Sequence, residues 1–256
     1  MFTMKRIIGT ITIKNGIAVQ SFGYKKYLPL GSPSCLAENL DRWGVDEIII
    51  LDMDRSINNL GPNLDLIESV SSIPISTPLI YAGGIRNIDD ATKAIESGAE
   101  RIVVDFLLNK FPNNLKLISE VVGVQSIISS IPVILNNDEL YHYDYNLKQT
   151  NFFNKNLLEL IKKYTSESLI IDVKNDGNVG KFDIRILDKI AIFALPVICY
   201  GGIDVSKKTE SILNEDKVSA VALDNVLNYT ELPVKKLRDK INKSNIRKPD
   251  LSIIGI

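Results

Sequence analysis

Short runs of aliphatic and β-branched residues alternate with longer amphipathic stretches along the whole chain. Apolar runs of roughly four to eight residues are typical of strands buried on both faces of a parallel sheet, with helices between them. Eight runs have this character, at residues 6–13, 47–52, 78–83, 101–105, 125–131, 167–173, 196–201 and 219–224. Eight strand–helix units predict an α/β fold, a (β/α)8 TIM barrel.

One predicted helix, residues 87–100, shows the start and stop features expected of such a unit. Asn87 is a suitable N-cap, acidic residues follow in the first turn, and Gly98 lies near the end. The helix is therefore expected to lead directly into the strand that begins at Arg101.

The two halves of the chain resemble each other. Three features recur at offsets of 118 to 120 residues. The matching pairs are Asp52 and Asp172, Gly83 and Gly201, and Asp105 and Asp224. A nearly constant offset predicts two similar half-barrels.

Length and charge limit the possible functions. The chain has 256 residues and a formal net charge of −1. We expect a single domain over residues 1–256, and neither nucleic acid nor a membrane as a partner, because no global basic field exists. The start MFTMKRII lacks the apolar core of a signal peptide, which favours a cytoplasmic protein.

Cysteine and histidine offer little chemistry. Cys35 and Cys199 have no ligand-spaced neighbours, and we interpret both as buried apolar thiols. The only histidine, His142, lies in the polar stretch 136–155, which we predict to be a surface loop on the barrel rim. One histidine cannot anchor the usual zinc ligand sets, so we expect no metal and no cofactor.

The active site of a (β/α)8 barrel lies at the carboxyl ends of its strands. Gly83, Gly84, Gly201 and Gly202 follow the third and seventh predicted strands there. Glycine lets backbone N–H groups approach a phosphate closely, although tight turns also need it for structural reasons. The duplicated turns favour a phosphate-binding role.

Several ordered segments resemble the cyclase subunit of imidazole glycerol phosphate synthase. They are KRIIGTITIKNG, VDEIIILD, GGIRNIDDATKAIESGAERI, NDGNVGKFD and LPVICYGGID. The resemblance covers nearly the whole chain and is weakest from about 132 to 155. It implies a barrel that takes ammonia from a glutaminase subunit docked on its N-terminal face and uses it at the opposite mouth.

The resemblance also implies a ring of four charged residues that gates the ammonia entrance. Its members here are Arg6, Glu47, Arg101 and Glu167, each at the start of a predicted strand. Side chains alternate along a strand, so all four can point inward and pair with one another. A set of ion pairs that only stabilises the barrel floor is an equally good interpretation.

The positions that carry cyclase chemistry depart from the family pattern. The resemblance places an acidic residue near the end of the first strand and another near the end of the fifth, where this chain has Thr12 and Pro132. Neither side chain exchanges a proton near neutral pH, so neither can act as general acid or base.

The expected phosphate sites are altered as well. Asp105 stands where the family normally has asparagine, Asp224 where it has a small apolar residue, and Tyr200 where it has a small hydroxyl residue. A carboxylate at 4 Å from a phosphate costs on the order of 4 kcal/mol at an effective dielectric of 20. Asn225 can still donate to an anion, but a bisphosphate substrate is disfavoured.

Three acids near strand ends are candidates for relocated chemistry: Asp52, Asp172 and Asp176. An Asx turn before Gly177 is the simpler explanation for Asp176.

Three hypotheses follow. The first is a divergent paralogue that keeps the ammonia-handling body and delivers ammonia to a sugar-modifying amidotransferase, in the manner of second copies found beside surface-polysaccharide (lipopolysaccharide) genes. The second is a working cyclase-lyase of histidine biosynthesis. The third is a non-catalytic barrel that serves as an assembly subunit. Whether the chain is an enzyme is left open by the residues.

Overall fold

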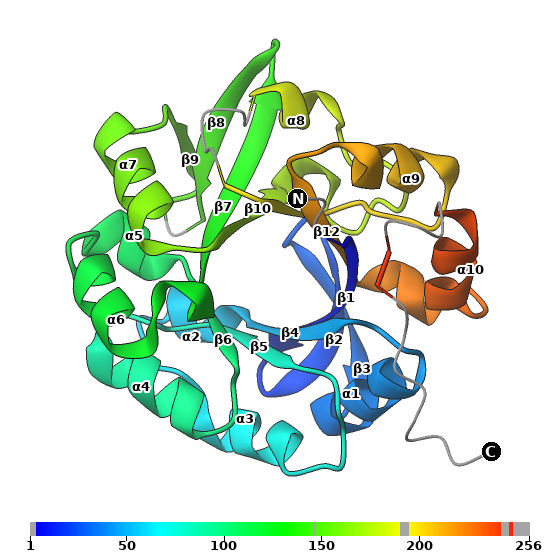
Figure 1. Ribbon diagram of the computed structural model, residues 1–256, viewed down its shortest axis with the longest axis horizontal. Helices are drawn as coiled ribbons and strands as arrows, with labels where there is room; N and C mark the ends of the chain where they lie inside the picture. Colours follow the sequence, from blue (N-terminus) through cyan, green and yellow to red (C-terminus); the bar gives the residue numbers. More distant parts are fainter. Residues whose placement is uncertain (1–3, 146, 190–194, 242–245, 248–256) are drawn as a thin grey trace.

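Eight parallel strands close into a barrel, because β1 (Arg6–Lys14) pairs with β4 (Glu47–Asp52) on one side and β12 (Val218–Leu223) on the other. The computed structural model describes residues 4–145, 147–189, 195–241 and 246–247. The remaining barrel strands are β5 (Leu79–Ala82), β6 (Arg101–Val104), β7 (Ile127–Asn136), β10 (Glu167–Asp172) and β11 (Val197–Tyr200), neighbours in that order. Figure 1 shows the ring of strands surrounded by helices. The predicted α/β (β/α)8 barrel is confirmed.

The helices pack around the outside of the strands (Figure 1). They are α1 (Pro33–Arg42), α2 (Met53–Ile57), α3 (Leu64–Ser71), α4 (Ile88–Glu96), α5 (Phe106–Lys110), α6 (Asn114–Val122), α7 (Lys155–Tyr164), α8 (Arg185–Lys189), α9 (Lys207–Asn214) and α10 (Pro233–Lys240). The Asn87 side chain caps α4 by accepting from the Asp90 N–H at 2.9 Å, as its sequence predicts. Helix α4 ends at Glu96, two residues before Gly98.

Apolar side chains form two separate cores. The larger core lies between the strands and the helices. The smaller core fills the barrel interior and includes Ile8, Ile49, Val103 and Leu169. Because side chains alternate along a strand, every barrel strand must be apolar on both faces, which explains the continuous apolar runs in the sequence.

Most of the described part of the stretch 136–155 is strand, contrary to the prediction of a loop. Strand β7 continues to Asn136 and turns into β8 (Glu139–Asp144), which pairs with β9 (Gln149–Asn151). His142 lies on β8, 6.1 Å from the ring of Phe153, and burial lowers its pKa. The sequence of this segment is rich in polar residues because a hairpin at the barrel rim presents one face to solvent.

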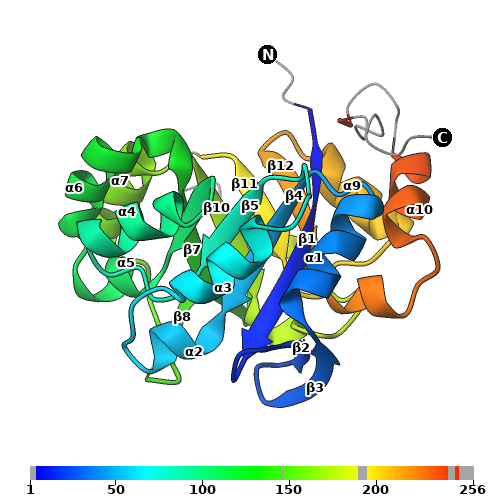
Figure 2. The same ribbon diagram turned by 90° about the horizontal axis from the view of Figure 1, so that it is seen from below.

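A second hairpin, β2 (Ile17–Phe22) and β3 (Lys26–Gly31), extends from the end of β1. Figure 2 shows this hairpin and β8 at the same end of the barrel, opposite the end at which β1 begins. Both hairpins therefore border the face formed by the carboxyl ends of the strands.

The two cysteines lie in different environments. Cys199 is fully buried on β11, and burial raises the pKa of its thiol. Cys35 is exposed, so its prediction as a buried thiol is wrong. Helix α1 buries Ala37 and Leu40 instead, which places Cys35 outside the apolar stripe. In the described part of the chain, no helix has the length and apolar character needed to cross a membrane.

Candidate functional site

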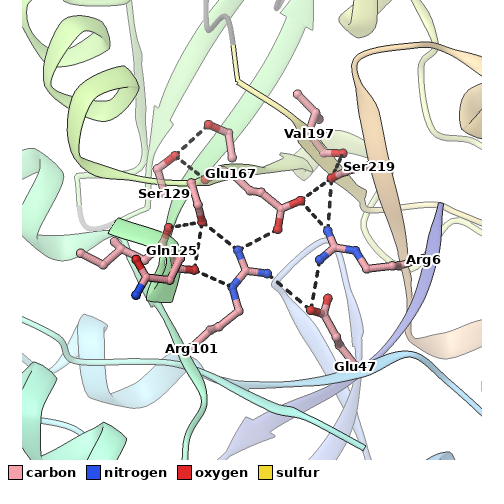
Figure 3. Close-up of polar contacts among 11 residues, drawn as sticks. Arg6, Glu47, Arg101, Gln125, Ser129, Glu167, Val197 and Ser219 are labelled. Carbon is pink, nitrogen blue, oxygen red and sulfur yellow. Dashed lines mark hydrogen bonds and ion pairs between the residues drawn. The ribbon is translucent and has the colours of Figure 1, made fainter. Parts of the chain in front are cut away.

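Four charged residues from the starts of four strands form a closed cycle of ion pairs at the N-terminal end of the barrel (Figure 3). Arg6 pairs with Glu47 at 3.1 Å and with Glu167, while Arg101 pairs with Glu167 at 2.7 Å and Glu47 at 3.5 Å. We call these four residues the charged ring. Each precedes a residue of the interior core by two positions, so the ring closes one end of that core.

The charged ring is largely removed from solvent, with its side chains between 9% and 17% exposed. Burial alone would raise the pKa of Glu167, but the facing guanidinium groups of Arg6 and Arg101 lower it. At Glu47 burial prevails over the same two arginines and raises the pKa. The two glutamates are therefore not equivalent.

Hydrogen bonds explain this difference. Glu167 also accepts a bond from the Ser219 hydroxyl at 2.5 Å, whereas Oε2 of Glu47 is buried and has no hydrogen-bond partner within the part of the chain that the structure describes. Arg101 is held from outside the ring by the Gln125 carbonyl at 3.2 Å and the Ser166 hydroxyl at 2.9 Å. Ionised Glu167 is the better satisfied of the two.

At the opposite end of the barrel, neither residue at the expected acid positions can exchange a proton near neutral pH. Thr12 is buried next to the phenol of Tyr200. Pro132 lies within β7, pairs with Ile171 of β10 and lines a cavity.

The second-half side of the mouth is filled by the chain's own side chains. The Tyr200 hydroxyl donates to Oδ2 of Asp224 at 3.0 Å, and Tyr24 from the β2–β3 hairpin lies beside the Tyr200 phenol. Burial raises the pKa of Asp224 to about 7. Nδ2 of Asn225, a predicted anion donor, is bonded to the Ser21 carbonyl at 2.7 Å.

The mouth also contains a cavity of about 420 Å³, which borders the end of β6 and is lined by residues of both halves. Its lining includes Asp105, Ser130 and Pro132 from the strand ends, together with Tyr143 and Tyr145 from the β8 side. Such a volume suits a small organic molecule. The two halves of the barrel therefore differ where the sequence repeat suggests similarity.

Asp105 and Asp52 are the acids among the residues that line this cavity. Burial raises the pKa of Asp105 to about 7, opposed by a hydrogen bond with Tyr145. Its Oδ1 is inaccessible to solvent and has no hydrogen-bond partner among the described residues. Although Asp105 is the N-cap residue of α5, its side chain accepts no capping bond.

The three acids proposed for relocated chemistry do not meet at one point. Asp52 and Asp172 follow the inward residues Leu51 and Ile171, so their side chains leave the strands on the outer side. Oδ2 of Asp172 accepts from Asn175 at 2.7 Å and from the Asp183 N–H at 3.0 Å, and Oδ2 of Asp52 accepts from Asn63 at 3.3 Å. Burial raises the pKa of both.

Asp176 has a structural role. Its Oδ2 accepts from the Ser21 hydroxyl at 2.7 Å and the Tyr24 N–H at 3.1 Å, which fastens the β2–β3 hairpin to the barrel. Burial raises its pKa. No local sequence pattern indicates these two hairpin partners, because they lie about 150 residues away along the chain.

The paired glycine turns are tightly packed against backbone. A Cβ on Gly201 would lie 2.5 Å from the Asp172 carbonyl oxygen, and one on Gly83 would lie 2.6 Å from that of Asp52. The Gly84 N–H donates to the Ser56 hydroxyl at 3.0 Å, and Gly202 closely approaches the Asn175 carbonyl. Close packing between consecutive loops is a sufficient reason for glycine at these positions.

Comparison with known proteins gives a consistent picture. A sequence model described as histidine biosynthesis protein matches residues 6–232. A putative imidazole glycerol phosphate synthase subunit hisF2 of Vibrio vulnificus strain YJ016 is 28% identical over 231 residues, 88% of this chain and 84% of the relative.

Two further relatives are named imidazole glycerol phosphate synthase subunit HisF. That of Natranaerobius thermophilus is 26% identical over 249 residues, 94% of this chain and 97% of the relative. That of Staphylococcus aureus strain JH9 is 27% identical over 247 residues, covering 94% and 98%. The similarity therefore extends over whole chains.

The inequality of the two ring glutamates predicts unequal losses of stability. We expect Glu167→Gln to lower the free energy of unfolding by about 3 kcal/mol at pH 7, because two buried arginines lose their better partner. Glu47→Gln should cost about 1 kcal/mol, since one of its oxygens has no partner to lose. Urea denaturation of both variants measures this, and equal losses would contradict the assignment.

The raised pKa of Asp105 predicts a pH-dependent gain in Asp105→Asn. Near pH 4 and below, both folded and unfolded chains hold the proton. Between pH 4 and 7 only the unfolded chain ionises, so wild type loses stability as pH rises. The free energy of unfolding of the variant relative to wild type should therefore rise by on the order of 4 kcal/mol over this range and then level off. Parallel profiles of the two proteins in denaturant titrations would refute the shift.

Proposed function

The chain belongs to the histidine biosynthesis protein family, and on that basis we propose that it is a cyclase-subunit-like barrel that receives ammonia from a glutaminase subunit and delivers it to an amidotransferase step. One contrast carries the proposal. The charged ring at the N-terminal end is complete, while the opposite mouth has Thr12 and Pro132 at the positions where the family resemblance expects acids.

The charged ring suits an entrance that admits a small neutral molecule. Its four groups are joined in a cycle of ion pairs, so opening one pair leaves the other three in place. Next to the ring the core has aliphatic side chains such as Ile8, Ile49 and Val103, which offer no hydrogen-bonding group to hold an ion. Neutral ammonia crosses such a region at lower cost than ammonium, because a desolvated charge is expensive.

The filled second-half mouth disfavours a bisphosphate substrate. Tyr200 and Asp224 occupy the barrel end beside the second glycine turn, and the Asn225 amide is already bonded. An anion placed there would meet the Asp224 carboxyl, which is costly. We propose that the ammonia is passed to a separate sugar-modifying amidotransferase, as in surface-polysaccharide synthesis.

A direct assay separates this function from histidine biosynthesis. The purified barrel is given an ammonium salt and the ribulosyl bisphosphate intermediate of the pathway, beside a HisF protein as positive control. We expect turnover at least a thousandfold below that control, since general acid–base catalysis contributes typically 10²- to 10⁴-fold per group. Turnover at the control rate would establish a working cyclase and overturn the proposal.

A binding assay tests the glutaminase partner and its face. We expect the chain to form a complex with a glutaminase subunit from the same genome and to stimulate glutamine hydrolysis. Val124 is 37% exposed just before β7, next to Gln125, whose carbonyl accepts a hydrogen bond from Arg101 of the charged ring. Phe152 is 74% exposed after β9, at the opposite end of the barrel. Val124→Glu should weaken the complex at least tenfold, and Phe152→Glu should leave it unchanged.

If calorimetric titrations show that Phe152→Glu weakens the complex and Val124→Glu does not, the docking face lies at the C-terminal rim. No complex with any glutaminase subunit of that genome would leave only the assembly-subunit hypothesis.

A further inference from the structure

Asp105 lines the mouth cavity, and its carboxyl group has one oxygen without a hydrogen-bond donor among the described residues. We propose that Asp105 is a binding site for an ammonium-type cation, either free ammonium or the primary ammonium group of a small organic amine. The proposal deepens the ammonia-delivery function and rests on it for the source of free ammonia.

Asp105 has unused hydrogen-bonding capacity. Its Oδ1 is buried and has no donor among the described residues, and its other contact is with Tyr145. The side chain does not cap α5. A buried acceptor without a donor costs free energy, and an N–H-bearing cation would supply both the donor and the opposite charge.

The surroundings of Asp105 favour a small cation. Ser130 lies one step beyond the Val104–Ser129 register pair, so its hydroxyl is on the neighbouring strand at the level of Asp105. Tyr143 and Tyr145 add aromatic surface, which attracts cations at ring faces. A single carboxylate with a hydroxyl is too small an oxygen set for calcium or magnesium.

Of the charged residues that line the cavity, Asp105 is the acid whose side chain points toward the barrel axis. Lys14 is engaged by Asp54 at 3.1 Å and lies 4.9 Å from the centre of the Tyr27 ring. Asp52 lines the cavity but accepts its hydrogen bond from Asn63 on the outer side. Lys148 is exposed at the rim.

Asp105 is also aligned with the charged ring. Arg101 of the ring, Val103 of the interior core and Asp105 occupy one face of the same chain segment, which rises about 3.3 Å per residue. Ammonia that passes the ring along β6 therefore reaches Asp105 after roughly 13 Å.

Asp105 can exchange a proton with ammonia without any further reactant. The protonated Asp105 carboxyl gives its proton to ammonia, and the products are a carboxylate and an ammonium ion joined by an N–H···O bond. The reverse transfer regenerates neutral ammonia for attack on an acceptor. A carboxyl group whose pKa is raised to about 7 by burial holds this proton at neutral pH and can take it back.

Asp224 provides a matched control from the other half of the barrel. Burial raises its pKa to about 7 as well. However, its Oδ2 accepts from Tyr200 at 3.0 Å and its Oδ1 from the Asn225 N–H, so both oxygens are used. Asp224 is not part of the cavity lining.

The experiment uses the isolated full chain at pH 8 and constant ionic strength. Binding of ammonium chloride and methylammonium chloride is followed by calorimetry and by thermal shift, with sodium chloride and tetramethylammonium chloride as controls. We expect both N–H-bearing cations to bind and the controls not to. Asp105→Asn should weaken binding at least tenfold, Ser130→Ala about threefold, and Asp224→Asn not at all.

Stronger binding of methylammonium would identify an organic amine as the ligand, and stronger binding of ammonium would identify delivered ammonia. Equal responses to all four salts, or binding retained in Asp105→Asn, would overturn the proposal. The assay contains no glutaminase, so its outcome is independent of whether the glutaminase complex forms.

Discussion

Closure of the barrel by the pairing of β1 with β12 is the constraint on which the rest of this structure depends. Once the sheet is closed, every second residue of every strand must point at a common axis. The interior then has room only for side chains that fit one another. Arg6 and Arg101 can be buried at its floor because the same closure brings Glu47 and Glu167 between them.

The two half-barrels have diverged at the mouth more than at the floor. Asp105 and Asp224 occupy equivalent positions of the repeat, and burial raises the pKa of both to about 7. In the second half Tyr200 satisfies the acid, and the β2–β3 hairpin covers it. In the first half the acid borders a cavity of about 420 Å³, and one of its oxygens has no partner among the described residues. A repeated framework has thus produced one filled and one open site.

The acids at the ends of β4 and β10 show how the position of a residue on a strand decides what its side chain contacts. Asp52 and Asp172 differ from the inward set by a single residue, which turns their side chains from the axis to the neighbouring loops. There they accept hydrogen bonds from Asn63, Asn175 and the backbone of the following unit. Their burial raises the pKa without giving them access to the axis. A perturbed pKa alone therefore does not identify a catalytic residue in this barrel.

The sequence by itself determined the strands, from their continuous apolar runs, and the half-barrel repeat, from motifs that recur at a nearly constant offset. The members of the charged ring followed from the family resemblance, and side-chain alternation along a strand allowed all four to point inward. It did not reveal the β8–β9 hairpin, whose half-exposed strands lack a strong apolar run, or the exposure of Cys35. Only the tertiary structure decided which side of the mouth is filled. The contacts of Ser21 and Tyr24 with Asp176, and the oxygen of Asp105 that has no partner among the described residues, depend on segments far apart in the chain, and no local pattern encodes them.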